Sequence, residues 1–291
     1  MSEFLMDLFI DVGNTHTVFG IYKGNSNDLS GLVTINKTVD IKYIVNSIED
    51  SLIEVRFSTN TIDTPDDMFN KIRNFLDFWG ANFSNGKYEI GRCVVSSVVP
   101  QVNFVIEGFI EKYLALQDSF YFVEANKDLG INWNTDNYKE MGADRVADIL
   151  GAMFLFNDNF IIIDFGTAIT IDIIKDKSYV GGAILPGFLL NVKSLFSNTA
   201  KLPMVEIKPA NKIYDNTTIG QIQIGCVDLV CKGINAVISE CLKEYKYKVI
   251  ITGGFSNMVK NIVINDYVIQ KLQFIGMINY VNILKNKLKS R

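Results

Sequence analysis

The sequence predicts an α/β protein built from two domains that are related by duplication. The motif Asp11-Val12-Gly13-Asn14-Thr15 has a counterpart in Asp164-Phe165-Gly166-Thr167-Ala168, and each copy follows a short apolar strand. A second apolar strand, residues 93–99, has its own counterpart at residues 249–255, at nearly the same separation along the chain. This separation is far longer than the roughly 20 to 50 residues of solenoid repeats, so it indicates two domains of one fold.

Length and composition describe a globular protein and exclude several classes. The chain has 291 residues, of which 48% are hydrophobic and 21% charged, enough for two domains with buried cores. The net charge of −4 gives no reason to expect a nucleic-acid partner, which usually needs a basic surface. No continuous apolar run reaches the roughly 18 residues of a membrane span, so we expect no membrane partner. The segment Met1-Ser2-Glu3-Phe4 has no basic residue, so we expect no signal peptide.

The cysteines and the single histidine narrow the chemistry further. The cysteines stand in apolar contexts without paired zinc spacing, and we interpret them as reduced thiols of a cytoplasmic protein. They are Cys93, Cys226, Cys231 and Cys241. The one histidine, His16, follows the first motif, where packing or a hydrogen bond near a phosphate is favoured over catalysis.

The first half of the chain alternates predicted strands and helices, assigned from apolar spacing and from turn residues. The predicted elements are a hairpin at 5–22, a strand at Leu32 to Ile35, a helix at 41–52, a polar irregular stretch at 54–66, a helix from Met68 to Trp79, a loop at Asn82 to Gly86, a strand at 93–99 and a helix that begins at Pro100. We place the first domain at residues 1–141 and the second at residues 142–291.

The second half repeats this order after a polar stretch at 126–141, which we interpret as a functional loop crossing between the domains. The predicted elements are a helix that begins near Asp144, a strand, hairpin and strand through residue 185, turns at Gly181-Gly182 and Pro186-Gly187, helices at 188–198 and 218–244, a strand near residue 250 and a terminal helix over about 277–289.

Each Asp-x-Gly motif forms the tip of a predicted hairpin that carries ligand-type groups. Asp11 and Asp164 stand where a carboxylate binds a hard cation such as Mg²⁺, often through water. Asn14, Thr15 and Thr167 add side-chain donors for phosphate oxygens. Two such tips facing each other would form a nucleotide clamp. Ordinary turn chemistry is the alternative for each residue alone, and the duplication favours the functional interpretation.

The segment Gly142-Ala143-Asp144-Arg145 begins a predicted helix and carries the best candidate for a general base. Phosphoryl transfer to a hydroxyl needs a carboxylate that accepts the proton, and the helix dipole favours the ionised form of Asp144. Arg145 could bind a substrate carboxylate with two parallel hydrogen bonds. The alternative is a helix N-cap Asp beside a surface Arg, and the pattern alone leaves both open.

Taken together, several segments resemble the type III pantothenate kinases over most of the chain, because their order and spacing match. The matching segments are Asp11 to Thr15, Ser96-Ser97-Val98-Val99-Pro100, Gly142 to Arg145, Asp164 to Ala168, Gly181-Gly182-Ala183-Ile184-Leu185-Pro186-Gly187, Thr199-Ala200-Lys201-Leu202-Pro203, and Thr218 seven residues before Gly225.

The resemblance implies two ribonuclease H-like domains of the actin-like ATPase fold and ATP-dependent phosphorylation of pantothenate, the first step of coenzyme A synthesis. It implies that Asp144 is the general base and that Gly142, Ala143, Arg145 and Thr218 bind the substrate. It implies that Asp164 binds a monovalent cation, K⁺ or NH₄⁺, and that Thr167 contacts ATP. The residues implied to bind ATP and Mg²⁺ are Asp11, Val12, Gly13, Asn14, Thr15, His16, Thr17 and Val18.

The resemblance also implies a homodimer whose pantothenate pocket lies at the subunit interface. The chain departs from the family pattern just before Gly142, where Thr135 and Tyr138 stand in place of the usual Tyr and Pro. Two alternatives follow from the residues: a kinase of the same fold with another small substrate, or a nucleotide-binding regulator without catalytic activity. The presence of Asp11, Asp144 and Asp164 argues against the regulator.

Overall fold

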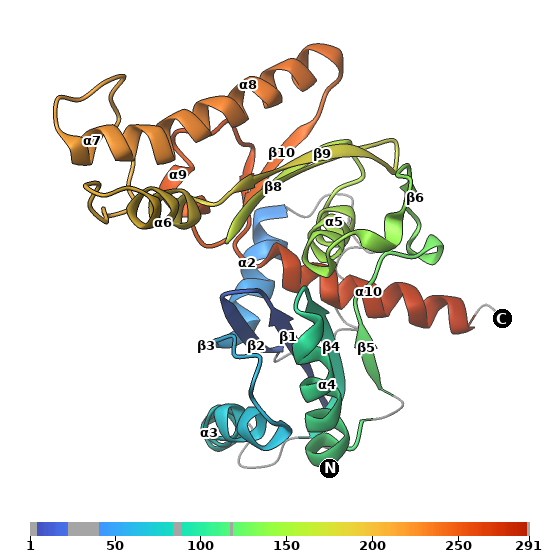
Figure 1. The fold of residues 1–291 in the computed structure, drawn as a ribbon. Helices are drawn as coiled ribbons and strands as arrows, with labels where there is room; N and C mark the ends of the chain where they lie inside the picture. Colours follow the sequence, from blue (N-terminus) through green and yellow to red (C-terminus); the bar gives the residue numbers. More distant parts are fainter. Residues whose placement is uncertain (1–4, 23–40, 84–88, 117–118, 290–291) are drawn as a thin grey trace. The chain divides into compact units, whose positions relative to one another are not determined.

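The computed structural model describes residues 5–22, 41–83, 89–116 and 119–289 (Figure 1). They form two compact units, each described here by itself. The first unit comprises residues 1–130, 137–156 and 272–291, and the second comprises residues 131–136 and 157–271. The predicted strand at Leu32 to Ile35 lies outside the described residues, as does the predicted loop from residue 84 on. The first two residues of that loop, Asn82 and Phe83, are helical, so the prediction is wrong there.

The first unit contains one five-stranded sheet, in the order β3-β2-β1-β4-β5. Its elements are β1 (Leu5–Val12), β2 (His16–Tyr22), α2 (Ile41–Ser51), β3 (Leu52–Ser58), α3 (Pro65–Phe83), β4 (Glu89–Ser97), α4 (Pro100–Phe109), η1 (Ile110–Leu114), β5 (Phe120–Phe122), η2 (Lys127–Leu129), η3 (Tyr138–Glu140), α5 (Ala143–Leu155) and α10 (Leu272–Lys289).

The central strand of this sheet, β1, pairs antiparallel with β2 and parallel with β4. β3 extends the antiparallel side, which makes the prediction of an irregular stretch from residue 54 wrong as far as Ser58. Ile53, Val55 and Phe57 are partly buried, whereas the polar residues between them are exposed. This alternation is typical of a strand with one buried face. Because every second residue is polar, the sequence alone favours an irregular stretch.

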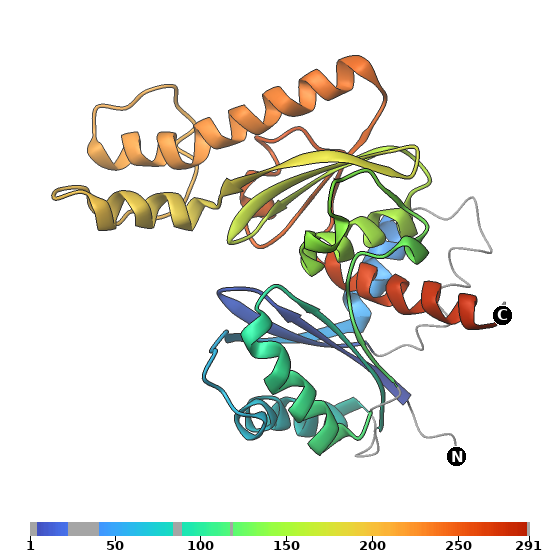
Figure 2. The ribbon, with the colours of Figure 1, turned by 45° about the vertical axis from the view of Figure 1, so that its right-hand side comes forward.

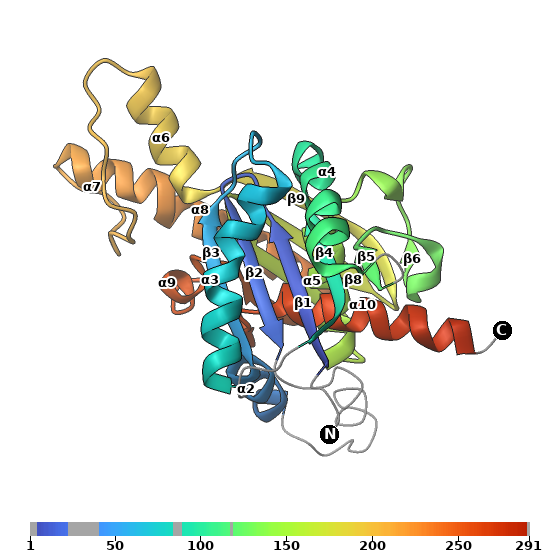
Figure 3. The same ribbon diagram turned by 90° about the horizontal axis from the view of Figure 1, so that it is seen from below.

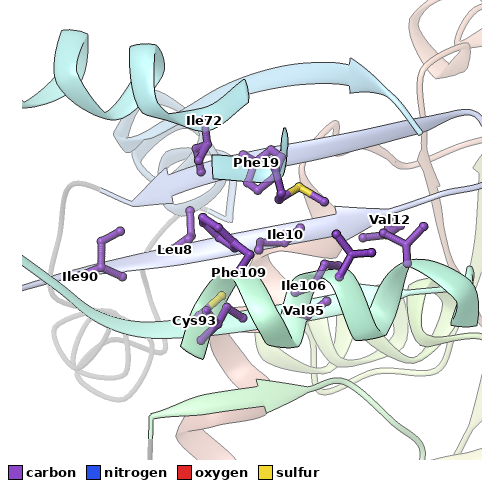
Figure 4. Close-up of a cluster of buried hydrophobic side chains, with 14 of the residues drawn as sticks. Leu8, Ile10, Val12, Phe19, Ile72, Ile90, Cys93, Val95, Ile106 and Phe109 are labelled. Atoms are coloured by element: carbon purple, nitrogen blue, oxygen red, sulfur yellow. The ribbon is translucent and has the colours of Figure 1, made fainter. Parts of the chain in front are cut away.

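Helices α3 and α4 cover one face of the sheet, and they lie side by side in Figure 3. Ile10 of β1 and Val95 of β4 pack there against Ile72, Ile106 and Phe109 (Figure 4). Because side chains alternate along a strand, residue 9 faces the other way. The Phe9 ring meets the Phe274 ring of α10 edge to face, with centroids 6.2 Å apart. Figure 2 shows the resulting layers, with α3 and α4 on one face and α10 on the other.

Helix α3 begins with a capping box, in which Thr64 and Asp67 each accept a hydrogen bond from the backbone N–H of the other. The Thr64 backbone N–H donates to the Asp67 carboxylate at 2.9 Å, and the Asp67 backbone N–H donates to the Thr64 hydroxyl at 3.2 Å. Pro65 occupies the first helical position, where its missing N–H has no cost. This capping box explains why the irregular stretch ends where it does.

The second unit contains a six-stranded sheet, in the order β11-β10-β7-β8-β9-β6. Its elements are β6 (Asn132–Trp133), β7 (Phe160–Phe165), β8 (Ala168–Lys175), β9 (Ser178–Pro186), α6 (Phe188–Asn198), α7 (Thr218–Gln223), η4 (Ile224–Asp228), α8 (Leu229–Glu244), β10 (Lys248–Thr252), α9 (Ser256–Val259) and β11 (Tyr267–Val268).

The two sheets confirm the predicted duplication. The order β9-β8-β7-β10-β11 repeats β3-β2-β1-β4-β5, with the same antiparallel and parallel pairings. Even the register agrees, because Asp11 lies opposite Ser96 on β4 and Asp164 lies opposite Thr252 on β10. The two Asp residues therefore occupy equivalent places at the ends of the two central strands.

The predicted turn at Gly181-Gly182 is wrong, because both residues lie within β9. Gly182 pairs with Asp172, next to a register irregularity between Ile173 and Ile174. A Cβ on Gly182 would lie 2.0 Å from the Ile171 carbonyl oxygen. The glycine pair therefore permits close strand approach at an irregularity, which is the other common role of glycine in a sheet.

The core of the second unit lies between its sheet and the long helical segment from Thr218 to Glu244. Ile163 and Ile251 of the sheet pack against Val227, Ile234 and Ile238 of η4 and α8. Among the described residues, this segment is the one helix long and apolar enough to cross a membrane, with a mean hydropathy of 1.4. Half of its most apolar window is buried inside the unit, as expected of a core helix.

The closest helix contact within the first unit is between α5 and α10, and it depends on two glycines. A Cβ on Gly276 would lie 1.7 Å from the Ala147 carbonyl oxygen, and one on Gly151 would lie 2.3 Å from the Leu272 carbonyl oxygen. The two backbones therefore approach more closely than any larger residue allows. Helix α10 begins at Leu272, before the predicted start near residue 277, because its first turn takes part in this contact.

The compact units do not follow the predicted boundary between residues 141 and 142. Helix α5 follows that boundary, yet it packs within the first unit, as does the C-terminal helix α10. Residues 131–136 join the second unit through β6, which pairs with β9. Contacts between residues define the compact units, whereas repeated motifs define the two predicted domains. The domain boundary at residue 141 therefore stays a prediction.

We predict that Gly276→Ala lowers the apparent free energy of unfolding by roughly 1–3 kcal/mol, because the new methyl group forces α5 and α10 apart. Gly233→Ala is the matched control, since Gly233 is an exposed glycine of α8 with nothing within 4 Å of its Cβ position. The control gains up to about 1 kcal/mol from helix propensity. Urea unfolding measures both changes, and equal stability of the two variants would contradict the packing role of Gly276.

Candidate functional site

The first tip joins β1 to β2 and is held by backbone hydrogen bonds. Gly13 donates its N–H to the His16 carbonyl oxygen at 2.9 Å, and Val98 donates to the Val12 carbonyl oxygen at 3.0 Å. The side chains of Asn14 and His16 are exposed, and Thr15 is partly buried. The side chains of Asn14 and His16 can therefore reach a ligand at the tip.

The remaining residues of the predicted nucleotide segment hold the hairpin in place. Val12 is fully buried, and Thr17 and Val18 are 4% and 5% exposed. They face the interior of the unit, so any contribution they make to a ligand comes from their backbone. The structure thus separates the predicted segment into groups that can face a ligand and groups that support them.

Asp11, at the end of β1, is bonded by a residue from the far end of the chain. Gln273 of α10 donates its side-chain amide to the Asp11 carboxylate at 2.7 Å and to the Ser96 hydroxyl at 3.0 Å. Sequence reasoning missed Gln273, since neither spacing nor a motif connects it to Asp11. The contact exists because α10 folds back onto the open face of β1.

The pKa of Asp11 is raised to about 7, chiefly because burial disfavours the charged carboxylate. The Gln273 hydrogen bond acts in the opposite direction, and the negative charge of Asp144 raises the pKa further. A hard cation would offset both unfavourable effects. A single carboxylate suits Mg²⁺, which keeps most of its ligands as water and phosphate oxygens. The residues present therefore fit a magnesium ion held jointly by Asp11 and a phosphate group.

Asp144 lies in the first turn of α5, as predicted. The N-cap residue of this helix is Gly142, so the alternative that Asp144 serves as an N-cap is wrong. Its carboxylate accepts a 2.7 Å hydrogen bond from the Arg145 backbone N–H. A Cβ on Gly142 would lie 2.5 Å from the same carboxylate, so a larger residue there would displace the Asp144 side chain. Asp144 and Arg145 are both partly buried, whereas Ala143 is buried.

The second tip, between β7 and β8, is one residue shorter than the first. The closing pair is Phe165 with Ile169, against Val12 with Thr17 in the first tip. Asp164 is partly buried and Thr167 is exposed. A Cβ on Gly253 would lie 2.1 Å from the Asp164 carboxylate, so Gly253 packs directly against the tip. Gly253 thus forms part of the tight turn between β10 and α9.

Thr218 and the two departures from the family pattern lie outside the tips. Thr218 is exposed at the first position of α7, next to the N-cap Thr217. Thr135 belongs to the second unit, and Tyr138 belongs to η3 of the first.

Across the described part of the chain, no three His, Cys, Asp or Glu side chains gather as a metal site. A cation bound by one carboxylate and a ligand is compatible with that finding.

Comparisons with known proteins identify the relatives of this chain. Residues 7–240 match the sequence pattern of the type III pantothenate kinase family. The type III pantothenate kinase of Thermosipho africanus is 36% identical over 90% of this chain and 92% of its own length. That of Thermosipho melanesiensis is 37% identical over 87% of this chain and 89% of its own length.

Among solved structures, a putative Baf family transcriptional activator from Campylobacter jejuni aligns over 97% of this chain and 99% of its own, with 20% identity and a TM-score of 0.49. A glucokinase from an Antarctic psychrotroph aligns over 96% and 99%, with 11% identity and a TM-score of 0.47. The fold assignment is based on the strand order and on the sequence relatives.

We predict that Asp11 makes the ligand-free protein less stable as the pH rises. Because its pKa of about 7 exceeds the ordinary value of 3.8, the folded state binds a proton more tightly than the unfolded state. The free energy of unfolding therefore falls between about pH 4 and pH 7. Asp11→Asn removes this fall and is more stable than the wild type at pH 8, by up to about 4 kcal/mol.

Urea unfolding in the presence of a chelator, at several pH values from 5 to 8, measures this difference. Parallel stability curves for the wild type and Asp11→Asn would show that Asp11 is not the titrating group.

Proposed function

This chain belongs to the type III pantothenate kinase family, and we propose that it transfers the γ-phosphate of ATP to pantothenate, with Asp144 as the general base. The product is 4′-phosphopantothenate, and the reaction is the first step of coenzyme A synthesis. The observation that supports this most directly is the placement of Asp144 near Asp11, close enough for the charge of one to raise the pKa of the other. A base and a cation-binding carboxylate of one unit are thus neighbours.

Asp144 accepts the proton of the pantothenate hydroxyl as that oxygen attacks phosphorus. Its position in the first turn of α5 places it at the positive end of the helix dipole, which favours the ionised form needed for a base. Arg145 binds the pantothenate carboxylate, because its planar guanidinium donates two parallel hydrogen bonds. Gly142 and Ala143 line this part of the pocket, and Thr218 adds a further contact to the substrate.

The first tip binds the phosphate groups of ATP through Asn14, Thr15, His16 and its backbone N–H groups. Asp11 holds Mg²⁺ through the phosphate or through water. When bound, this ion neutralises charge that builds up on the phosphate oxygens. Gln273 keeps the Asp11 carboxylate in one orientation, so that the cation site exists before the ligand arrives.

The second tip has a separate task in the proposal. Asp164 binds a monovalent cation, K⁺ or NH₄⁺, and Thr167 contacts ATP. The half-buried position of Asp164 and the exposure of Thr167 support this division. The close packing of Gly253 against the Asp164 carboxylate fixes its position without supplying another side-chain ligand.

We propose that the protein works in the cytoplasm as a homodimer, with a pantothenate pocket completed at the subunit interface. Large apolar side chains are exposed along neighbouring elements of the second unit, from β9 through α6 to α7. They are Val180, Ile184, Leu190, Phe196, Met204, Ile213, Tyr214 and Ile219. In the proposed dimer, these side chains are buried at the subunit interface, which removes their apolar surface from water. Light scattering should give the mass of a dimer, and a monomer at micromolar concentration would contradict the proposal.

Incubation of the protein with pantothenate, ATP, Mg²⁺ and K⁺ tests the reaction. We expect 4′-phosphopantothenate, and a loss of turnover when K⁺ is replaced by Na⁺. No 4′-phosphopantothenate, together with ATP consumption only when another small hydroxylated compound such as a sugar is supplied, would indicate a kinase of the same fold with a different substrate. Nucleotide binding with no turnover, over several nucleotides and cations, would indicate a regulator.

We predict that Asp144→Asn lowers kcat by about 10²- to 10⁴-fold, since the variant keeps the shape of the side chain and loses the base. ATP binding remains, because the first tip is unchanged. Glu140→Gln is the matched control, as Glu140 is an exposed acid shortly before α5. Calorimetry measures nucleotide binding and a coupled assay measures turnover. Normal turnover by Asp144→Asn would show that the base is a different residue.

A further inference from the structure

The residue that follows β3 is hydrogen-bonded to the first tip at three points. Thr59 donates its backbone N–H to the Thr15 carbonyl oxygen at 3.0 Å. Its hydroxyl donates to the Gly13 carbonyl oxygen at 2.6 Å and lies 3.0 Å from the Thr17 hydroxyl. Thr59 therefore contacts the beginning, the middle and the end of the segment that turns from β1 into β2.

The hydroxyl contacts form a short directed chain. A threonine hydroxyl has one proton, and Thr59 donates it to Gly13, so the Thr17 hydroxyl donates to Thr59. Hydrogen bonds arranged in this way polarise and strengthen one another. Thr17 is 4% exposed, so water does not readily replace Thr59 as its partner. Loss of the Thr59 hydroxyl would remove a partner from both neighbours at once.

The equivalent position in the second repeat is Gly187, which follows β9 as Thr59 follows β3. Gly187 donates its backbone N–H to the Thr167 carbonyl oxygen at 3.1 Å, which matches the bond from Thr59 to Thr15. A Cβ on Gly187 would lie 2.2 Å from the Thr167 carbonyl oxygen. The backbone bond is thus common to both repeats, whereas the side-chain bonds are particular to the first tip.

The segment that carries Thr59 is itself anchored to α3. Asn60 donates its side-chain amide to Asp63 at 2.9 Å, and Asp63 forms an ion pair with Lys71 of α3. The Asp63 side chain is 9% exposed and that of Lys71 is 29% exposed, so this pair is largely shielded from water. Thr64 then caps the helix. Thr59 is therefore held by a fixed support on the side away from the tip.

We propose that Thr59 is a positioning residue that sets the first tip in the shape that receives nucleotide phosphates. The proposal rests on the proposed function for the identity of the nucleotide. Carbonyl oxygens repel anions, and Thr59 engages those of Gly13 and Thr15. Because both carbonyl oxygens are hydrogen-bonded to Thr59, the exposed Asn14 side chain is left to face the phosphates.

Two substitutions separate the hydroxyl from the shape of the side chain. Thr59→Val keeps the branched shape and loses the hydroxyl, while Thr59→Ser keeps the hydroxyl and loses a methyl group. We expect Thr59→Val to weaken Mg-ATP binding about tenfold, the effect of one lost hydrogen bond with its partners left unpaired. The KM for ATP rises by a similar factor, whereas the KM for pantothenate changes less than about twofold. Thr59→Ser binds Mg-ATP within about twofold of the wild type.

Thr64→Val is the matched control, because it removes a hydroxyl from the same segment that caps α3 and has no contact with the tip. It should lower the unfolding temperature and leave ATP affinity unchanged. Hydrogen exchange in the nucleotide-free protein adds a readout independent of activity. Amides of residues 13–17 should exchange faster in Thr59→Val than in Thr59→Ser or the wild type.

Unchanged ATP affinity in Thr59→Val, or equal losses in Thr59→Val and Thr59→Ser, would overturn the positioning role. An equal loss in Thr64→Val would overturn it as well, since general destabilisation would then explain the effect. ATP binding is measured directly without pantothenate. A wild-type chain that binds ATP but does not phosphorylate pantothenate would therefore contradict the proposed function alone, and the comparison of variants would still decide the role of Thr59.

Discussion

The structure depends on the pairing of each central strand along both of its edges. β1 is fixed between an antiparallel and a parallel neighbour, and β7 is fixed in the same way. A shift of one residue would turn every buried side chain of β1 toward the opposite face, so the register is strongly determined. The ends of these strands carry Asp11 and Asp164. Their positions are therefore a consequence of how the cores pack.

A second constraint acts within the first unit, where the closely packed helices α5 and α10 each bring one residue to Asp11. Helix α5 carries Asp144, whose charge raises the pKa of Asp11, and α10 carries Gln273, whose hydrogen bond lowers it. Gly151 and Gly276 allow this contact, although neither has a functional side chain. Stability and site geometry thus depend on the same two positions.

Duplication provided two equivalent tips, and the structure shows how they have diverged. The first tip is longer by one residue and is bonded by the Thr59 side chain. The second is shorter and is enclosed by Gly187 and Gly253, which leave no space for a side chain. The backbone bond from Thr59 to Thr15 has a direct counterpart in the bond from Gly187 to Thr167. Differences in side chains and loop length, on a shared strand scaffold, permit two different ligand roles.

Local patterns in the sequence were sufficient to determine the duplication, most helices, both hairpin tips and the helix that Gly142 caps. Hydrophobic periodicity and turn residues act over short distances, and repeated motifs reveal equivalent places without coordinates. Local pattern failed at β3 and at Gly181-Gly182, because pairing with a neighbouring strand outweighed the polar and glycine signals.

Only the tertiary structure brought Gln273 to Asp11 and Thr59 to the first tip. Only the tertiary structure showed that α5 and α10 pack in one unit. These contacts join residues far apart in the chain, and they form because helices and strands bury their apolar faces against one another. No local pattern encodes such a contact, because the free energy that produces it comes from packing the whole unit.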